Sequence, residues 1–490
     1  MNAPIIFKLL SVILATIGGT FCICLGIEGL YHNELFHPAL KGWVLTVIIT
    51  FTLTVLFRYL GRNASHKIFR RESLCVIGVG WILVCVIGSL PYMLILPDFS
   101  FTDALFESTS GLTTTGATIF IDLSILPPSL MFWRCISQWL GGLGIVVFFV
   151  AILSYIGAGA KTLYSNEASA QAGDIDSGRI QEGVLKILAL YLGLSFACLM
   201  AFHWCGLSWF NAICHMFTTV ATGGFSTLND SLGGFENPAL EWTAMLFMIL
   251  GGTSFLVMIQ VLKGNFSYAL KNSELFTYLF LIFAFGGCIS ILLTIEHVGY
   301  TDAHSLVRDS FFQTISILTT TGYTTTDYNL WPRVIHILII LMMVMGGCSG
   351  STSGGVKIVR FVIAAKICLL NIEKSFRARL IRPITLNKEN VDSNTLESVL
   401  TFMLTVGLLL FICVPLLGLF EHESSFKSIV SMAIATLFNI GPGFGSIGPS
   451  HTYTFLTPAT KLVLSIFMIM GRLEFYAILV LFIPSFWRRH

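Results

Sequence analysis

The sequence has few charged residues: Lys, Arg, Asp and Glu make up 11% of its 490 residues, whereas about a quarter is usual for soluble domains. Hydrophobic residues make up 55%, in long runs that recur along the chain. Runs of roughly 20 apolar residues are long enough to cross a bilayer as helices. The composition therefore predicts a polytopic helical membrane protein. The net charge of +2 gives no indication of nucleic-acid binding.

The chain also lacks the motifs of enzymes and of nucleotide-binding proteins. It has no HExxH pair, and its twelve cysteines include no CxxC pair, so we interpret the cysteines as small buried hydrophobes. The Gly-Val-Lys run at 355–357 is not the Gly-Lys-Ser/Thr that a P-loop needs, and the glycines at 141–144 follow no strand. The sequence predicts no enzymatic activity and no cofactor bound by this chain.

A short loop rich in threonine and glycine occurs four times. Each copy follows a short apolar segment and precedes a long one. Glycine permits unusual backbone angles, and threonine adds a hydroxyl acceptor. Four such loops around one axis would present rings of carbonyl oxygens, which replace the water around K⁺. The predicted ion-binding residues are Thr114, Thr115, Gly116, Ala221, Thr222, Gly223, Thr320, Thr321, Gly322, Asn439, Ile440 and Gly441.

These loops divide the chain into five predicted parts: an N-terminal two-helix domain (1–72) and pore repeats at 73–157, 158–263, 264–392 and 393–490. The second repeat begins with a cytoplasmic connector. The N-terminal part has two apolar segments, at 5–30 and 43–60, and no such loop. Each repeat has a first span, a short segment, the loop and a second span. The predicted segments are 74–96, 102–111 and 130–156; 184–204, 208–219 and 240–262; 275–295, 303–318 and 334–370; and 396–420, 425–437 and 460–487.

The short segments cannot cross a bilayer, and irregular backbone at membrane depth is tolerated only inside protein or along a watery cavity. We therefore expect re-entrant half-helices at the centre of the bundle. The predicted fold is an all-α polytopic membrane protein with two N-terminal helices and four pseudo-symmetric helix–pore-helix–helix repeats around one central pore, ten spans in all. Glycines at matching places in the second spans support internal duplication: Gly141, Gly251, Gly346 and Gly471.

The second span of the third repeat is interrupted by a run of glycine, serine and threonine that cannot hold a regular helix well. We expect a broken helix whose middle lies in the pore below the loops and acts as a gate; a kink for helix packing is the alternative. The predicted gate residues are Gly346, Gly347, Gly350, Ser351, Thr352, Ser353, Gly354 and Gly355, with Lys357 just after them.

Arg472 lies within the apolar run at 462–482. A charge there is costly, by about 2.5–3.5 kcal/mol on insertion scales, and normally faces the bundle interior or water. We expect it to raise a barrier to cations below the loops or to hold the Gly-rich run through its carbonyls. Glu474 is two residues away on a helix and would point elsewhere. A structural ion pair with another carboxylate is the alternative.

The basic connectors at 58–71 and 366–388 predict the cytoplasmic side, which places the loops towards an acidic outer face. An acidic outer face would concentrate cations at the mouth of the pore.

Together, the four loops, the Gly-rich run and the extra N-terminal pair resemble the membrane subunits of Trk-type potassium uptake systems (TrkH/TrkG) in the Trk/Ktr/HKT superfamily, over essentially the whole chain. The resemblance implies K⁺ uptake across the bacterial inner membrane. It also implies a homodimer, a TrkA-like cytoplasmic regulatory subunit that binds NAD or ATP, and an arginine matching Arg472. Some sodium-preferring plant relatives have serine in the first loop, where this chain has Gly116.

The sequence leaves three alternatives to a K⁺ channel: a symporter coupled to H⁺ or Na⁺, a Na⁺-selective transporter, and a polytopic membrane enzyme. A symporter predicts symmetric broken helices at the midplane, whereas only the third repeat is visibly interrupted in the sequence. A membrane enzyme would need clustered titratable residues within spans, and only Arg472 and Glu474 stand out there.

Overall fold

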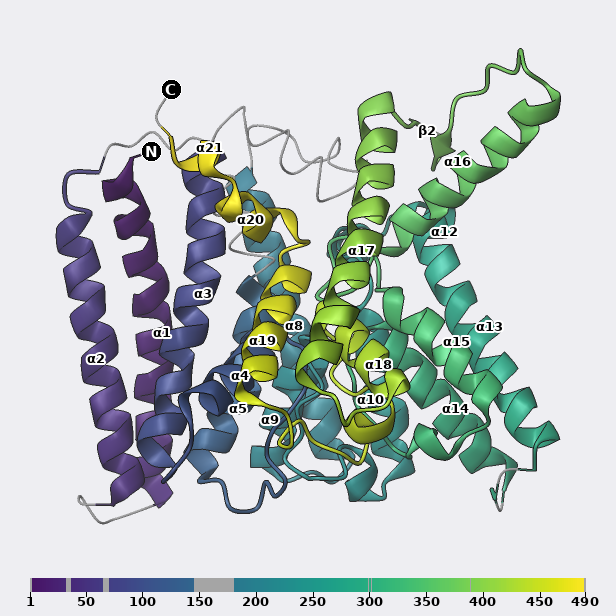
Figure 1. The fold of residues 1–490 in the computed structure, drawn as a ribbon. Helices are drawn as coiled ribbons and strands as arrows, with labels where there is room; N and C mark the ends of the chain where they lie inside the picture. The colour runs from purple at the N-terminus through teal and green to yellow at the C-terminus, as the bar shows by residue number, and fades with distance from the viewer. Residues whose placement is uncertain are drawn as a thin grey trace.

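The computed structural model describes residues 2–31, 37–64, 70–144, 180–297, 299–300, 302–387 and 389–488. Nearly all regular structure in these ranges is helical, apart from one hairpin of β1 (Thr385–Leu386) and β2 (Glu389–Asn390). The helices form a slab with both chain ends on the same side (Figure 1). The predicted all-α class is confirmed.

The chain begins with two long helices and then follows one order of elements four times. The first two are α1 (Ala3–Tyr31) and α2 (Pro38–Leu60). The first long helices of the units are α3 (Arg70–Ile95), α8 (Ile180–Trp204), α13 (Ser273–Ile295) and α17 (Ser393–Phe420). The short helices are α4 (Phe101–Leu112), α9 (Trp209–Val220), α14 (Ala303–Leu318) and α18 (Phe426–Leu437).

The second long segments all begin at or beside a proline, whose fixed φ suits a helix start. They are α5 (Pro128–Leu143); α10 (Pro238–Gly251) with α11 (Phe255–Leu262); α15 (Arg333–Val344) with α16 (Ile358–Phe376); and α19 (Pro458–Arg472) with α20 (Tyr476–Leu479). The smaller helices are η4 (Gly233–Phe235), α12 (Phe266–Lys271), η5 (Tyr328–Leu330), η6 (Gly445–Ile447), η7 (Val480–Phe482) and α21 (Pro484–Trp487).

The N-terminal pair lies at one end of the slab and packs on the first unit (Figure 1). The Trp43 indole N–H donates to the hydroxyl of Ser129 on α5 at 2.7 Å. The Phe21 and Trp133 rings meet with their centroids 4.7 Å apart. These contacts join the N-terminal pair to α5, the second long helix of the first unit.

The four short helices begin with the same hydrogen bond. A Ser or Asp side chain at the N-cap accepts from the backbone N–H three residues on, and so satisfies one of the N–H groups that a helix start leaves free. The capping residues are Ser100, Ser208, Asp302 and Ser425. With 12 to 16 residues each, these helices lie where the sequence predicts half-helices and are too short to cross a bilayer at about 1.5 Å per residue.

Two of the predicted second spans are not straight. The axes of α10 and α11 are bent by 100°, and those of α19 and 476–482 by 117°. The first bend follows the glycines at 251–252, and the second contains Glu474 and Phe475 with positive φ of 51° and 68°. The segments predicted as second spans at 240–262 and 460–487 are therefore each broken in two, because left-handed residues and paired glycines interrupt the helical hydrogen bonds.

Within the described ranges, six helices are long and apolar enough to cross a membrane, or eight when each bent pair counts as one span. The predicted 130–156 span and the connector after it lie partly outside these ranges, and the predicted 334–370 span is in two pieces. The expected number of ten stays a prediction.

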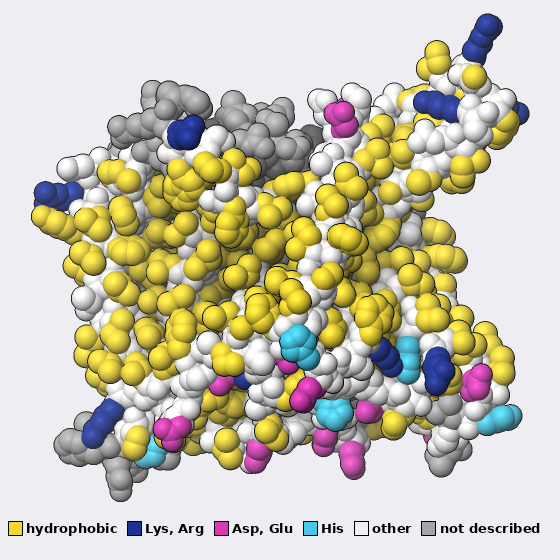
Figure 2. Space-filling model, in the orientation of Figure 1, with side chains coloured by type: hydrophobic (Ala, Val, Ile, Leu, Met, Phe, Trp, Pro, Cys, Tyr) yellow, Lys and Arg dark blue, Asp and Glu magenta, His cyan; other side chains and the backbone are white. Residues whose placement is uncertain are grey.

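The two edges of the slab differ in charge. Figure 2 shows acidic and histidine side chains along its lower edge, with some lysine or arginine side chains near them, below a broad hydrophobic band. Lysine and arginine gather on the segment that projects from the upper edge beyond α16. This distribution agrees with the predicted orientation, in which the basic edge faces the cytoplasm.

Candidate functional site: a ring of loops and an internal loop

The four Thr/Gly loops close into a ring. In each loop one glycine lies so close to a carbonyl oxygen of the next loop that an added Cβ would come within 2.6 Å of it. Gly116 faces Gly223, Gly224 faces Thr321, Gly322 faces Ile440, and Gly441 faces Thr115. The fourth loop therefore returns to the first, and main-chain oxygens from all four units take part in one closed ring of contacts.

The backbone conformation is the same in the four loops. Each has a non-glycine residue with φ between 52° and 57°, followed two residues later by a glycine with φ between 78° and 97°. The pairs are Thr114 and Gly116, Thr222 and Gly224, Thr320 and Gly322, and Asn439 and Gly441. Left-handed backbone is uncommon outside glycine and gathers at functional sites, where surrounding structure enforces it.

This geometry corrects the predicted register of the second loop by one residue. The sequence prediction matches Gly223 to Gly116, with Ala221 and Thr222 before it. By backbone angle the counterpart of Gly116 is Gly224, so Ala221 falls outside the matched positions. The error arises because two consecutive glycines are equally able to take positive φ.

Backbone hydrogen bonds give the same register. In each loop the residue after the left-handed one donates its N–H to a carbonyl five residues earlier, at 2.8–2.9 Å. The bonds run from Thr115 to Ser110, Gly223 to Thr218, Thr321 to Ser316, and Ile440 to Ala435. The loops are thus anchored to the ends of their half-helices in one common way.

The second-span glycines lie against these half-helix ends in three of the four units. A Cβ on Gly141, Gly251 or Gly471 would contact the carbonyl oxygen of the last residue of the half-helix, at 1.8, 3.1 and 1.9 Å. Gly346 instead faces Gly354 of its own loop, at 2.1 Å. In units one, two and four the glycine therefore allows close packing against the half-helix. In unit three it allows close packing against Gly354 of the same unit.

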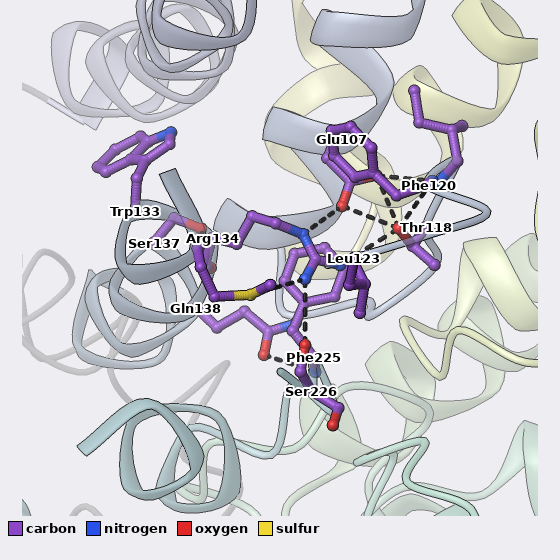
Figure 3. Close-up of polar contacts among 12 residues, drawn as sticks. Glu107, Thr118, Phe120, Leu123, Trp133, Arg134, Ser137, Gln138, Phe225 and Ser226 are labelled. Carbon is purple, nitrogen blue, oxygen red and sulfur yellow. Dashed lines mark hydrogen bonds and ion pairs between the residues drawn. The ribbon is translucent and has the colours of Figure 1, made fainter. Parts of the chain in front are cut away.

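Behind the first two loops lies a buried ion pair (Figure 3). Glu107 on α4 and Arg134 on α5 approach to 2.8 Å, with neither side chain more than 1% exposed. Arg134 also donates to the Thr118 hydroxyl and to the Ser226 carbonyl, both at 3.2 Å. Its guanidinium carbon lies 4.1 Å from the centre of the Phe225 ring. One side chain thus contacts the segments that follow both loops.

One turn further along α5, Gln138 holds the second loop directly. Its amide N–H donates to the carbonyl of Gly223 at 2.6 Å, and its amide oxygen accepts from the backbone N–H of Phe225 at 3.0 Å. On the first loop, Glu107 accepts from the backbone N–H of Ile119 at 3.0 Å.

Buried tyrosines hold the other junctions of the ring. Each hydroxyl or backbone N–H crosses from one unit to the next: Tyr323 contacts Thr219 at 3.1 Å, Tyr328 donates to Gly443 at 2.9 Å, and Tyr453 donates its backbone N–H to Thr118 at 2.9 Å. Asn439 adds an amide bond to the Thr115 hydroxyl at 2.9 Å.

Between α15 and α16, residues 345–357 form a closed internal loop, which we call the gate loop. Met345 and Val356 pair as a parallel bridge at its neck, where the Gly346 N–H donates to the Val356 carbonyl at 2.9 Å. Inside it, the Gly347 N–H donates to the Ser353 hydroxyl at 3.0 Å. The helix interruption predicted from the Gly-rich run is therefore present.

The gate loop lies against the break between α10 and α11. The Cys348 N–H donates to the Gly252 carbonyl at 2.8 Å, and the Thr352 N–H to the Gly251 carbonyl at 3.2 Å. On the side of the ring, the Gly354 N–H donates to the Thr320 hydroxyl at 2.6 Å. The carbonyls that the 100° bend removes from the helix are thus satisfied by the gate loop.

Two buried charges anchor the gate loop from opposite sides. The Arg472 guanidinium donates to the carbonyls of Thr352 at 2.7 Å and Gly141 at 3.1 Å. Glu274, in the first turn of α13, accepts from the backbone N–H of Ser349 at 2.7 Å. These are charge-assisted bonds, which are stronger than neutral ones.

Lys357 is also buried, and its ammonium donates to the Ser353 carbonyl. Glu474 pairs with Arg360, so it is not the partner of Arg472. Arg134 on α5, Glu274 on α13 and Arg360 on α16 are further charges within long helices, and none of them was among the predicted site residues. The cost of an intramembrane charge could have identified these three.

Among the described residues, no group of three His, Cys, Asp or Glu side chains could hold a metal ion. A helical membrane protein in which four re-entrant hairpins close such a ring has the architecture of a cation-conducting pore. The chain belongs to the TrkH family of cation transport proteins, whose family profile matches residues 40–489.

The relatives cover nearly the whole chain. It is 31% identical over 489 residues to the Trk system potassium uptake protein TrkH of Vibrio parahaemolyticus, covering 99% of both chains. It is 35% identical to TrkI of Halomonas elongata, covering 84% of this chain and 83% of TrkI. The crystal structure of the potassium transporter TrkH from Vibrio parahaemolyticus matches with a TM-score of 0.89 at 30% identity, covering both chains fully.

Proposed function

We propose that this protein takes up K⁺ across the bacterial cytoplasmic membrane through the ring of four loops. The closed ring of main-chain oxygens is the observation that carries the proposal. Carbonyl oxygens at equivalent positions of four loops can replace the hydration shell of an alkali cation. The relatives are named as potassium uptake proteins, which favours K⁺ as the transported ion.

The gate loop closes the path on the inner side of the ring. It contacts loop three through Thr320, and a Cβ on Gly354 would lie 2.6 Å from the Phe438 carbonyl, next to loop four. Arg472 holds it from below and places a positive charge near the path. Removing the gate loop from this position opens the pore.

Control comes from the cytoplasmic side, through a TrkA-like subunit that binds NAD or ATP and docks on the basic edge. The protein works as a homodimer with one pore in each chain. A binding assay with a TrkA-type protein tests the partner, and the mass of the detergent-solubilised protein tests the dimer. No association, or a monomer, would remove that part of the proposal.

A symporter coupled to H⁺ or Na⁺ is the second candidate. Broken helices at the centre of the bundle are typical of such transporters, and three of the four second long segments are interrupted. Only the interruption in the third repeat was predicted from the sequence, and the bends observed in the second and fourth repeats favour this candidate.

The test is ion flux in proteoliposomes that contain the purified full chain, with K⁺, Rb⁺ or Na⁺ on either side. Passive K⁺ flux that exceeds Na⁺ flux supports the pore, and a Gly116→Ser variant is expected to lower the K⁺/Na⁺ ratio. Strict dependence on an opposing H⁺ or Na⁺ gradient would replace the pore by a symporter. A Gly116→Ser variant with an unchanged ratio would contradict the role of the ring.

A further inference from the structure

The junction between the first and second loops is built differently from the other three. Seven residues before the left-handed residue of each loop stands a buried side chain that differs in every unit: Glu107, His215, Gln313 and Met432. Glu107 alone among these four belongs to an ion pair between Lys or Arg and a carboxylate in the described part of the chain.

The apolar counterpart shows that packing does not require a charge at this position. Met432 is fully buried in the fourth unit, where the backbone of the loop is the same as in the first. A buried ion pair is often no more stable than apolar residues of similar volume. The pair of Glu107 and Arg134 therefore calls for an explanation other than stability.

The contacts of the pair supply that explanation. The guanidinium of Arg134 makes three directed contacts from one planar group: to Glu107, to the Thr118 hydroxyl and to the Ser226 carbonyl. Thr118 lies two residues after Gly116, and Ser226 lies two residues after Gly224. A rigid fork of this kind fixes the separation of its partners, which a flexible lysine cannot do.

We infer that Arg134 and Glu107 are positioning residues that set the selectivity of the pore for K⁺ over Na⁺ by holding the first two loops at a fixed separation. The inference rests on the proposed function, because it requires the ring to select the ion. The pair lies behind the loops and does not touch the ion. Loss of the pair therefore lowers the K⁺/Na⁺ flux ratio more strongly than it lowers the K⁺ flux.

The decisive variant is Arg134→Lys, which keeps the buried positive charge but loses the fork. Proteoliposome flux of K⁺ and Na⁺ is measured with the full chain. We expect the K⁺/Na⁺ ratio to fall by about three- to tenfold, the effect of losing one or two hydrogen bonds, while K⁺ flux stays within about twofold. Glu107→Gln, which keeps one acceptor oxygen, is expected to lower the ratio less.

A charge exchange, Glu107→Arg with Arg134→Glu, separates positioning from charge balance. The exchanged pair keeps both charges, but an arginine at 107 offers no acceptor to the Ile119 N–H. We expect the exchange to leave the ratio low. Restoration of the ratio by the exchange would mean that charge balance alone matters, and would overturn the inference.

Arg308→Lys is the matched control, because Arg308 also pairs with a buried glutamate, Glu241 on α10, at 2.7 Å. Among the described residues, the ion pairs of Arg308 are with Glu241 and Asp309, and neither of these belongs to the four loops. Its K⁺/Na⁺ ratio is expected to equal that of the unchanged protein.

A normal ratio in Arg134→Lys, alongside a lowered ratio in Gly116→Ser, would overturn the inference and leave the proposed pore standing. A normal ratio in both would remove the pore and the inference together. Aggregation of both Arg134→Lys and Glu107→Gln, with Arg308→Lys folded, would assign the pair a structural role and overturn the inference.

Discussion

The ring of loops and the gate loop beneath it use the same residue types, glycine, serine and threonine, yet they are held in opposite ways. The ring is braced by side chains that lie behind it, at each junction between units. The gate loop is held mainly by bonds of its own backbone to carbonyl groups, to one threonine hydroxyl and to two charged side chains; the Thr352 hydroxyl adds bonds to two carbonyls. Composition therefore does not tell how a loop of these residues is held; the surrounding contacts do.

The difference has a physical basis. A loop braced by a closed circle of neighbours cannot move without breaking several junctions at once. A loop whose anchors are a handful of hydrogen bonds can leave when those bonds are exchanged for water or for another partner. Three variants test this contrast, two of them by removing an anchor of the gate loop, and a fourth tests a carboxylate outside both loops.

The largest effect is expected from Gly322→Ala, in the ring. The new Cβ would lie 1.9 Å from the Ile440 carbonyl, at a φ of +81°, which costs about 1–2 kcal/mol for a residue with a side chain even before the clash. We expect K⁺ flux to fall more than about tenfold. Gly407→Ala is the control, since nothing lies within 4 Å of a Cβ there. Normal flux through Gly322→Ala would show that the ring is as adaptable as the gate loop.

The next effect is expected from Arg472→Gln, in the gate-loop anchor. The change removes charge-assisted bonds to Thr352 and Gly141, each worth roughly 1.5–3 kcal/mol, so we expect basal K⁺ flux to rise about tenfold with the K⁺/Na⁺ ratio unchanged. The exposed pair of Arg382 with Glu373, at 3.0 Å, supplies the control Arg382→Gln. A changed ratio in Arg472→Gln would place this arginine with the ring instead.

A smaller effect of the same sign is expected from Glu274→Ala. The Ser349 N–H would lose its carboxylate acceptor, and basal K⁺ flux should rise by about three- to fivefold. Glu274→Gln keeps an acceptor oxygen and should stay within about twofold of the unchanged protein. Equal increases in the two variants would mean that the charge of Glu274, and not its hydrogen bond, holds the loop.

The smallest effect is expected at the outer mouth, with Asp122→Asn. The backbone N–H and hydroxyl of Ser124 hold the pKa of Asp122 below its ordinary value of 3.8. A lowered pKa keeps the carboxylate ionised above 3.8 and delays its loss until the pH falls through the lowered value. We expect the KM for K⁺ to rise by less than about twofold in low salt and not at all in high salt. Asp122→Glu is the control, and an effect that persists in high salt would contradict an electrostatic origin.

Much of the fold could be predicted because membrane-spanning helices and internal repeats leave clear patterns in the sequence. Hydropathy marks the long segments, and the four short helices lie at the places that the Thr/Gly loops indicated. The bends after α10 and α19 could not be predicted in this way. An apolar run has the same hydropathy whether it is straight or turns by 100°, and only the glycines at 251–252 carried a trace of the first bend.

The repeated backbone conformation of the loops was predicted to within one residue, and the contacts that support it were missed. Three of the four loop glycines are those that the sequence indicated, and the fourth is displaced from Gly223 to Gly224. The residues that hold the ring from behind lie far from their partners in sequence; for example, Tyr453 donates its backbone N–H to Thr118. Such pairs leave no local pattern, so a single sequence cannot show them, although the burial cost of a charge points to Arg134.

The bend between α10 and α11 has a consequence for how the path opens. Its freed carbonyls at Gly251 and Gly252 are satisfied by the gate loop, and a buried carbonyl without a partner is costly. If the gate loop moves away as proposed, solvent must reach these oxygens at the same moment. Hydration of these carbonyls and opening of the path would then be one event, which involves the second and third units of the chain.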